Sequence, residues 1–487
     1  MAEQRYGRVY NFVDGAERPP ADGQVRAVMA PATAEQLGEF AWSAPVDVVA
    51  AVDAAAAAAR GWADLGMPAR RDTILRWGVV VAGLTDEIAM ADALNSGTPI
   101  RNMRVGVVKG LDYLKFFCGL WSEVKGETIP ASPGHLHYTQ REPFGPVGII
   151  IPFNHPTLFA LSKTVPALLA GNTVVLKPSE LTPLSAAILA RASVDCLPPG
   201  VLNVVHGGGD VGAAIVADPR LQRLHFTGGV TTGLRVQRGA ADSGVVKHVS
   251  LELGGKNPLI ALADADPAVV AQAAVIGMNY TRNQGQSCGS TSRLFVHSDI
   301  AAPVVEQVCR LVERIRVGLP DDETTEMGSL ISADHQQRVL AAVAGGTADG
   351  ARILVGGTAA ADQLSGGAYV LPTVMDRVGP GSALATEEIF GPVLGVQQWT
   401  DRDDLLERVN GTAYGLAAAI YTQDIGQALA LTRDVGAGYV WVNTIETRWP
   451  ATPFGGFKNS GVGSEHALDE ILGYTRVKAV NIAVPSS

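Results

Sequence analysis

The chain has 487 residues, 47% of them hydrophobic, and a formal net charge of −10 at pH 7. This length exceeds one ordinary core, so we expect two or three domains that bury a large apolar interior. The acidic balance disfavours a polyanion-binding surface, so nucleic acid is not an expected partner.

The start of the sequence lacks the apolar core of a signal peptide, and the most apolar early run is too short and too charged to span a membrane. The four cysteines lie far apart, without the paired spacing of a zinc ribbon: Cys118, Cys196, Cys288 and Cys309. We therefore expect a cytoplasmic protein with free thiols, no membrane association and no metal site.

The first 119 residues are mostly helical in pattern. Apolar residues recur at three-to-four spacing over 45–62, 69–95 and 101–118, which predicts three helices that cover a sheet. Residues 136–142 then alternate between apolar and polar, as in a half-exposed strand that leaves the main body. Such a strand is able to pair with another chain.

From residue 145 onward, continuous apolar segments alternate with helical ones. Strands are expected at 147–151, 173–177, 201–206, 224–226 and 246–251, with helices near 157–169, 183–194, 211–217 and 231–241. Strands that are apolar on both faces and alternate with helices form a parallel, doubly wound sheet. The pattern therefore predicts a nucleotide-binding domain, with its ligand at the carboxyl ends of the strands.

The usual glycine fingerprint of such domains does not follow the first strand, which continues into Pro-Phe-Asn-His-Pro at 152–156. The turn at 226–233 instead runs from a strand into a helix N-terminus, which can hold a pyrophosphate; a glycine turn without a ligand is the alternative. Lys177 and Glu180 can reach ribose hydroxyls, and the carboxylate would repel a 2′-phosphate; a solvated charge pair is the alternative.

A second α/β region begins after residue 255, with strands expected at 258–262 and 294–297 and helices at 267–280 and 301–317. Within it, amides and glycines surround Cys288, where an inert core cysteine would have apolar neighbours. Residues 474–482 alternate again, which predicts an exposed edge strand suited to pairing between subunits.

Three side chains form a candidate reaction centre. Glu252 lies in an apolar segment that runs into a glycine pair, and Asn154 is held between two prolines. Together with the thiol of Cys288, they supply a nucleophile, a general base and an oxyanion donor for chemistry through a covalent thioester.

In this order, and over nearly the whole chain, the motifs resemble those of the NAD(P)-dependent aldehyde dehydrogenase superfamily. The resemblance rests on residues 152–154, 177–180, 226–228, 252–256, 285–288, 388–392 and 453–456. It implies that Cys288 attacks an aldehyde and that Asn154 and the Cys288 backbone N–H hold the oxyanion. It further implies that Glu252 activates the water that hydrolyses the thioester.

The resemblance also implies which residues bind NAD. Lys177 and Glu180 would contact the adenosine ribose and Glu388 the nicotinamide ribose, with Phe390 packed at the nicotinamide end. The other expected contacts are Ile151, Pro152, Phe153, Ser179, Phe226, Thr227, Gly228, Gly229, Gly233, Leu253 and Gly254. Glu180 favours NAD and leaves NADP use open.

Substrate contacts are expected beside the nucleophile and around the last glycine-rich loop, at Gly289, Ser290, Arg448, Trp449 and Phe457. Trp449 and Phe457 suit an aromatic or medium-chain aldehyde. Arg448 would either pair with a substrate carboxylate or be a solvated surface charge. His155 either lines the aldehyde tunnel or packs, and Gly229 replaces a serine that is usual in the family.

The leading interpretation is NAD-dependent oxidation of an aldehyde to its carboxylic acid. The alternatives are a semialdehyde dehydrogenase, with an acidic substrate or coenzyme A as acyl acceptor, and a catalytically silent NAD-binding homologue. The family implies an NAD-binding domain (1–121 and 147–253), a catalytic domain (254–455) and a small β oligomerisation arm (122–146 and 465–487). It also implies a homodimer or a homotetramer.

Overall fold

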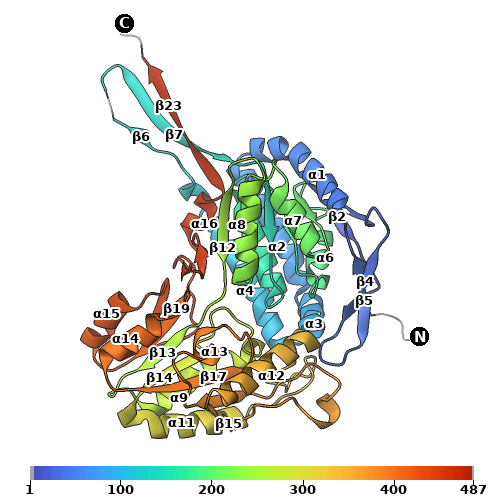
Figure 1. The fold of residues 1–487 in the computed structure, drawn as a ribbon. Helices are drawn as coiled ribbons and strands as arrows, with labels where there is room; N and C mark the ends of the chain where they lie inside the picture. The colour runs from blue at the N-terminus through green and yellow to red at the C-terminus, as the bar shows by residue number, and fades with distance from the viewer. Residues whose placement is uncertain (1–4, 131, 485–487) are drawn as a thin grey trace.

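The fold is shown in Figure 1 as a computed structural model, which describes residues 5–130 and 132–484. Two α/β bodies lie one above the other, and a long β arm projects from the upper body. In the described part of the chain, no helix has both the length and the apolar character that crossing a membrane requires.

The N-terminal region contains short strands that the sequence pattern did not predict. They are β1 (Arg8–Val9), β2 (Asn11–Val13), β3 (Ala16–Arg18), β4 (Val25–Met29) and β5 (Gln36–Ala41). β1, β5 and β4 form a sheet of their own, whereas β2 and β3 extend the edge of the large sheet of the upper body. Each strand has six residues or fewer, too few for a period of two to stand out in the sequence.

Four helices follow these strands: α1 (Pro45–Asp64), α2 (Met67–Gly83), α3 (Thr85–Ser96) and α4 (Ile100–Gly119). The prediction of one helix over 69–95 is therefore wrong. Leu84 leaves helical geometry (φ −104°, ψ 11°), and a new helix begins at Thr85. Asp86 and Glu87 lie in the first turn of that helix, where negative charge stabilises the N-terminus.

The upper body is built on an eight-stranded sheet with the order β22-β12-β11-β8-β9-β10-β2-β3. Its five central strands run parallel and are β8 (Pro146–Ile150), β9 (Thr173–Lys177), β10 (Leu202–Val204), β11 (Arg223–Thr227) and β12 (His248–Glu252). The predicted parallel sheet is thus confirmed. The strands β2 and β22 (Gly461–Val462) add antiparallel edges to it.

Helices cover both faces of this sheet. On one face, α5 (Pro156–Leu169) and α6 (Leu184–Arg191) pack with α2, α3 and α4; on the other lie α1, α7 (Gly209–Ala217) and α8 (Val230–Asp242). Along β9, Val174 and Leu176 enter the first core and Val175 enters the second. Because the central strands are parallel, their carboxyl ends meet at one edge of the sheet, where ligands of this fold bind.

The lower body is built on a seven-stranded sheet with the order β15-β16-β17-β14-β13-β19-β20, in which only β15 is antiparallel to its neighbour. The strands are β13 (Pro258–Ala261), β14 (Arg293–His297), β15 (Arg352–Val355), β16 (Thr373–Asp376), β17 (Val393–Trp399), β19 (Ala417–Tyr421) and β20 (Tyr439–Val442). This second parallel α/β unit was also expected from the sequence.

The helices of the lower body are α9 (Pro267–Gly277), α10 (Tyr280–Asn283), α11 (Ser298–Glu313), α12 (Ala333–Ala348), α13 (Ala383–Thr386), α14 (Arg402–Asn410) and α15 (Ile425–Asp434). Two of the predicted helices are present with different bounds. The helix expected over 267–280 ends at Gly277, because Asn279 takes a left-handed φ of 60°. The helix expected over 301–317 runs instead over α11, where the His297 side chain accepts from the Asp299 N–H at its start.

The arm is a three-stranded antiparallel sheet of β6 (Thr128–Ile129), β7 (His135–Pro143) and β23 (Thr475–Ala483). The strand expected over 136–142 pairs with the tail of its own chain, since β7 and β23 are in register from Pro143↔Thr475 to His135↔Ala483. The helix α16 (Leu468–Leu472) precedes β23 and packs against α5. The arm therefore brings the C-terminal segment back onto the upper body.

We propose the domain boundaries 1–121 with 147–253, 254–455, and 122–146 with 465–487. Residues 1–4, 131 and 485–487 of these segments lie outside the described residues. The strand β22 follows the proposed end of the catalytic domain and pairs with β12 through Leu251↔Val462 and Glu252↔Gly461. The chain thus returns to the upper body beside the end of β12 before it enters the arm.

Candidate active site

Cys288 lies in the loop between α10 and β14. The Nδ2 of Asn257 donates to the backbone carbonyls of Cys288 (2.7 Å) and Ser290 (3.0 Å). The Ile331 N–H donates to the side chain of Gln286 at 3.0 Å. The polar groups around the cysteine thus fix the backbone of the loop, and the thiol lines a cavity.

Asn154 follows β8 and faces this loop. Its Nδ2 donates to the backbone carbonyl of Gln286 at 2.9 Å, and its Oδ1 is buried without a hydrogen-bond partner among the described residues. Over the same described ranges, the backbone N–H of Cys288 donates to no protein acceptor. The Asn154 amide thus contacts the loop that carries Cys288, and neither its second N–H nor the Cys288 N–H has an acceptor among the described residues.

Glu252 is the last residue of β12 and is paired in register with Thr227 of β11. Its side chain is buried, and its Oε1 has no hydrogen-bond partner in the described part of the chain. Burial raises the pKa of Glu252 well above its ordinary value, Glu465 raises this pKa further, and Lys163 lowers it. A buried carboxyl with a raised pKa is suited to proton exchange with a bound water or substrate.

Sequence reasoning missed a charged cluster next to Glu252. Lys163, on α5, is fully buried, and its Nζ lies 2.7 Å from Oε1 of Glu465 and 3.1 Å from Oε1 of Glu470. Burial raises the pKa of Glu470 to about 7. The sequence signal for this cluster was a single lysine within an otherwise mostly apolar helix, because a buried ammonium requires a counter-ion.

One cavity of about 430 Å³ brings Cys288, Asn154 and Glu252 together. It is also lined by Pro152, Phe153, Thr227, Gly228, Gly229, Leu253, Gly254, Glu388 and Phe390. Burial raises the pKa of the Cys288 thiol to about 12, and the positive charge of Arg448 acts in the opposite direction. The three residues predicted to be catalytic thus share one space with most of the expected contacts at the nicotinamide end.

Glu388 and Phe390 also line this cavity. The Gly255 N–H donates to Oε1 of Glu388 at 3.0 Å, and a Cβ on Gly254 would overlap the same carboxylate. The Phe390 ring packs edge-on against Phe153 at 5.8 Å between centroids. Gly254 is therefore needed for the close approach of the carboxylate to the turn that follows β12.

A second cavity, of about 440 Å³, continues from the first, since Pro152, Phe153, Thr227, Gly228 and Gly229 line both. Its remaining walls include Ile151, Lys177, Ser179, Glu180 and Phe226. The Nζ of Lys177 lies 3.4 Å from Oε2 of Glu180. The pair expected at the adenosine ribose therefore lies together at the end of β9, inside a cavity.

Two glycines of the turn before α8 serve different purposes. Gly229 caps the helix, and no atom lies within 4 Å of a Cβ built there, so the serine usual in the family would fit. Gly233 lines neither of these cavities. A Cβ there would lie 2.6 Å from the Leu253 side chain, so this glycine allows α8 to pack closely on the end of β12.

The expected substrate contacts next to the nucleophile occupy different environments. Gly289 lies against the guanidinium of Arg448, because a Cβ at this glycine would overlap Nη2. The Cζ of Arg448 lies 4.3 Å from the ring centroid of the buried Phe454. Ser290 is buried, and its Oγ donates to the Gly285 carbonyl at 3.4 Å, behind the loop.

The two aromatic residues expected to contact the substrate lie on the surface. Trp449 is 67% exposed and Phe457 is 55% exposed. Phe457 lies in β21 (Phe457–Lys458), which pairs with β18 (Tyr414–Gly415). Neither ring lines the two cavities that contain the candidate catalytic and NAD-binding residues, or the cavity beside His155.

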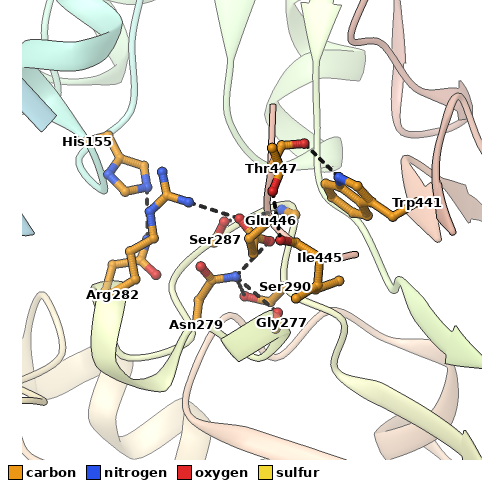
Figure 2. Close-up of polar contacts among 12 residues, drawn as sticks. His155, Gly277, Asn279, Arg282, Ser287, Ser290, Trp441, Ile445, Glu446 and Thr447 are labelled. Atoms are coloured by element: carbon orange, nitrogen blue, oxygen red, sulfur yellow. Dashed lines mark hydrogen bonds and ion pairs between the residues drawn. The ribbon is translucent and has the colours of Figure 1, made fainter. Parts of the chain in front are cut away.

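The third cavity, of about 330 Å³, adjoins His155 and is lined by Arg101, Lys109, Arg282 and Glu446, among others. Figure 2 shows that Arg282 and Asn279 both point toward Glu446; Nη1 of Arg282 lies 2.9 Å from Oε2, and Nδ2 of Asn279 donates to Oε1 at 3.1 Å. His155 lines this cavity, and its ring lies 6.0 Å from that of Phe159 between centroids.

A thiol, a buried carboxyl and an amide line one cavity, which continues into a second cavity at the carboxyl ends of parallel strands, where nucleotides bind in this fold. This arrangement is typical of an oxidoreductase that uses a dinucleotide. A sequence model described as "Aldehyde dehydrogenase family" matches residues 19–480. The chain therefore belongs to the aldehyde dehydrogenase family and is an NAD(P)-dependent aldehyde dehydrogenase, as its motifs predict.

Individual relatives agree over almost the full length. The chain is 38% identical to aldehyde dehydrogenase tropH of Talaromyces stipitatus, over 97% of this chain and 92% of that protein. The NAD+ complex of an aldehyde dehydrogenase from Bacillus cereus superposes with a TM-score of 0.95 at 35% identity, covering 98% and 97% of the two chains. PnpE of Pseudomonas sp. WBC-3, in complex with nicotinamide adenine dinucleotide, gives 0.95 at 34% identity, covering 98% of each.

Proposed function

We propose that this chain oxidises an aldehyde to its carboxylic acid with NAD, through a thiohemiacetal and a thioester on Cys288. The observation that carries the proposal is the single cavity that Cys288, Asn154 and Glu252 line together, continuous with a groove along the carboxyl ends of the upper sheet.

The groove fits NAD in size and chemistry. The two connected cavities, of about 430 and 440 Å³, match the two halves of a dinucleotide, and the N-terminus of α8 lies where they meet. Glu388 at one end and Glu180 with Lys177 at the other are suited to hold the two riboses. Glu180 favours NAD over NADP, because its carboxylate would repel a 2′-phosphate.

Addition begins at Cys288. Its Sγ forms a bond to the carbonyl carbon, the C=O π bond breaks, and the charge passes to oxygen. The Asn154 amide and the Cys288 N–H donate to that oxygen. Arg448 favours the thiolate that this step needs, because its charge opposes the effect of burial on the thiol pKa.

When bound, NAD supplies a hydride acceptor, which leaves a thioester on Cys288. Glu252 then takes a proton from water while the water oxygen attacks the thioester carbon. The C–S bond breaks, the thiolate is regenerated, and a free acid leaves. The presence of Glu252 supports water as the acyl acceptor in preference to coenzyme A.

An NADH-absorbance screen over a panel of aldehydes, with NAD and NADP in parallel, tests the reaction. Release of acid without added coenzyme A excludes the acylating alternative. We expect Cys288→Ala to abolish turnover while calorimetry still detects NAD binding. Cys309→Ala is the matched control, because this thiol lies on α11 outside the site and should leave turnover unchanged.

Glu252→Gln tests the base. We expect one burst of NADH per site and then a stall, because the thioester forms but is not hydrolysed. Equal steady-state rates for wild type and Glu252→Gln would remove Glu252 from that role. A chain that is catalytically silent would give no burst in either protein.

We also propose that the chain forms a homodimer or a homotetramer through the arm and that it acts in the cytoplasm. The exposed apolar side chains of β23, Val477 and Ile482, support pairing through this strand. Sedimentation of the full chain distinguishes the two assemblies from a monomer.

A further inference from the structure

Arg448 is a cation beside the nucleophile that forms no ion pair with any described residue, although the negative charge of Glu446 acts on it. Its Nε is buried without a hydrogen-bond partner, and over residues 5–130 and 132–484 its guanidinium forms no ion pair or hydrogen bond. The group is held between the backbone at Gly289 and the face of Phe454. Leaving such a donor group unpaired is costly, which indicates that a ligand completes it.

The walls of the neighbouring cavity carry more positive than negative charge. Arg282 and Asn279 already satisfy Glu446, the one carboxylate among the described residues that line this cavity. Lys109 lines the same cavity and forms no ion pair within the described chain. The protein as a whole carries a net charge of −10, so this cationic cavity is a local exception that attracts anions.

The loop that carries Arg448 is fixed in place. Glu446 takes a left-handed φ of 56°, and its carboxylate is bound by Arg282 and Asn279 (Figure 2). The Trp441 Nε1 donates to the Thr447 carbonyl at 2.8 Å, which ties the next residue to β20. A strained residue held by two partners presents Arg448 toward the nucleophile at a defined position.

Resting on the function proposed above, we propose that the substrate is an aldehyde that carries a carboxylate, that Arg448 binds this carboxylate beside Cys288, and that Lys109, on the wall of the neighbouring cavity, attracts it. The planar fork of Arg448 is suited to bidentate binding of a carboxylate. The exposed positions of Trp449 and Phe457 remove the support for a purely apolar aldehyde.

The test compares near-isosteric pairs of anionic and neutral aldehydes: 4-oxobutanoate with pentanal, and 4-formylbenzoate with 4-methylbenzaldehyde. For at least one pair, we expect the wild-type kcat/KM to be about tenfold or more higher for the anion, since charge-assisted pairing adds to binding. A neutral aldehyde that is used as well as its anionic partner in both pairs overturns the proposal.

Variants assign the preference to Arg448. In Arg448→Met, the ratio of kcat/KM for the anion to that for the neutral aldehyde should fall about 30-fold or more, because a buried charge pair has lost one partner. Arg448→Lys should restore part of the ratio. Arg314→Met, an exposed arginine at the end of α11, is the control that should leave the ratio unchanged. An equal loss of kcat/KM for both aldehydes would indicate that Arg448 acts only on the Cys288 thiol, and would overturn the proposal.

Binding separates this proposal from the proposed function. Calorimetry with Cys288→Ala should detect 4-oxobutanoate or 4-formylbenzoate, and the added Arg448→Met should weaken that binding about 30-fold or more. If no aldehyde gives NADH while this binding is seen, the proposed function fails and carboxylate recognition stands. If neutral and anionic aldehydes are oxidised equally and bind equally, carboxylate recognition fails and the oxidation stands.

Discussion

Replacing Lys163 by methionine would leave a buried pair of carboxyl groups without their counter-ion. Lys163 is fully buried, and its Nζ lies 2.7 Å from Glu465 and 3.1 Å from Glu470. Methionine has a similar length and is apolar, so the change removes the charge with little loss of volume. The perturbation therefore reports on electrostatics more than on packing.

The magnitude follows from those distances. At an effective dielectric constant of roughly 20, each attraction is worth about 5–6 kcal/mol, before the cost of burying the ions is subtracted. Breaking a buried ion pair by removing one partner costs about 3–5 kcal/mol in practice. For a cooperative unit of 150–250 residues, about 2–4 °C are lost per kcal/mol, so Lys163→Met should lower the Tm by about 6–20 °C.

The loss of Tm in Lys163→Met should be larger at high pH than at low pH. Burial raises the pKa of Glu470 in the folded state to about 7, so its contribution to stability is full at low pH and is lost as the pH rises through about 7. Lys163 lowers this pKa and limits that loss. Without Lys163, the cost of ionising the buried Glu470 grows. The Tm difference between variant and wild type should therefore widen from pH 5 to pH 8.

Scanning calorimetry at pH 5 and pH 8 measures both quantities. Lys115→Met is the matched control, since this lysine is on the surface, 3.7 Å from Asp112, with 70% of its side chain exposed. Exposed pairs contribute little to stability, so the control should melt with the wild type at both pH values. A Tm for Lys163→Met within 2 °C of the control, or a difference that narrows toward pH 8, would refute this account of the cluster.

Three further predictions concern the cofactor groove and the oxyanion. Glu180→Gln should raise kcat/KM with NADP relative to NAD by about tenfold, because it removes a charge that repels the 2′-phosphate; an unchanged ratio in steady-state assays would exclude this role. Gly254→Ala should weaken NAD binding in calorimetry, because the new Cβ displaces the Glu388 carboxylate, and unaltered affinity would contradict that contact. Asn154→Ala should lower kcat about 10²–10³-fold with little change in the affinity for NAD. A kcat within threefold of wild type would exclude the Asn154 amide as an oxyanion donor.

Much of the fold could be predicted because buried parallel strands produce long apolar runs. The central strands β8, β9, β11 and β12 lie where those runs predicted them, within two residues. The strands β1 to β5 were missed because each is short, and β2 in addition pairs with the distant strand β10. The break at Leu84 was missed because the apolar period continues across it, while the backbone does not.

The catalytic residues were easier to predict than the substrate contacts. Cys288, Asn154 and Glu252 each occur in unusual local sequence, and the structure gathers them in one cavity. Trp449 and Phe457 were chosen by proximity in sequence to the glycine-rich loop, which does not determine the direction of a side chain. Exposure depends on which elements cover a loop, and the sequence of the loop does not carry that information.

The geometry separates the residues proposed to carry out the chemistry from the residue proposed to select the substrate. Glu252 and Asn154 follow strands of the upper sheet, whose registers fix them. Arg448 instead lies on a loop whose conformation depends on Glu446 and on the two side chains that bind it. A substitution at Arg282 would therefore release the loop and change which aldehyde is accepted, while the strand ends that carry the chemistry keep their positions.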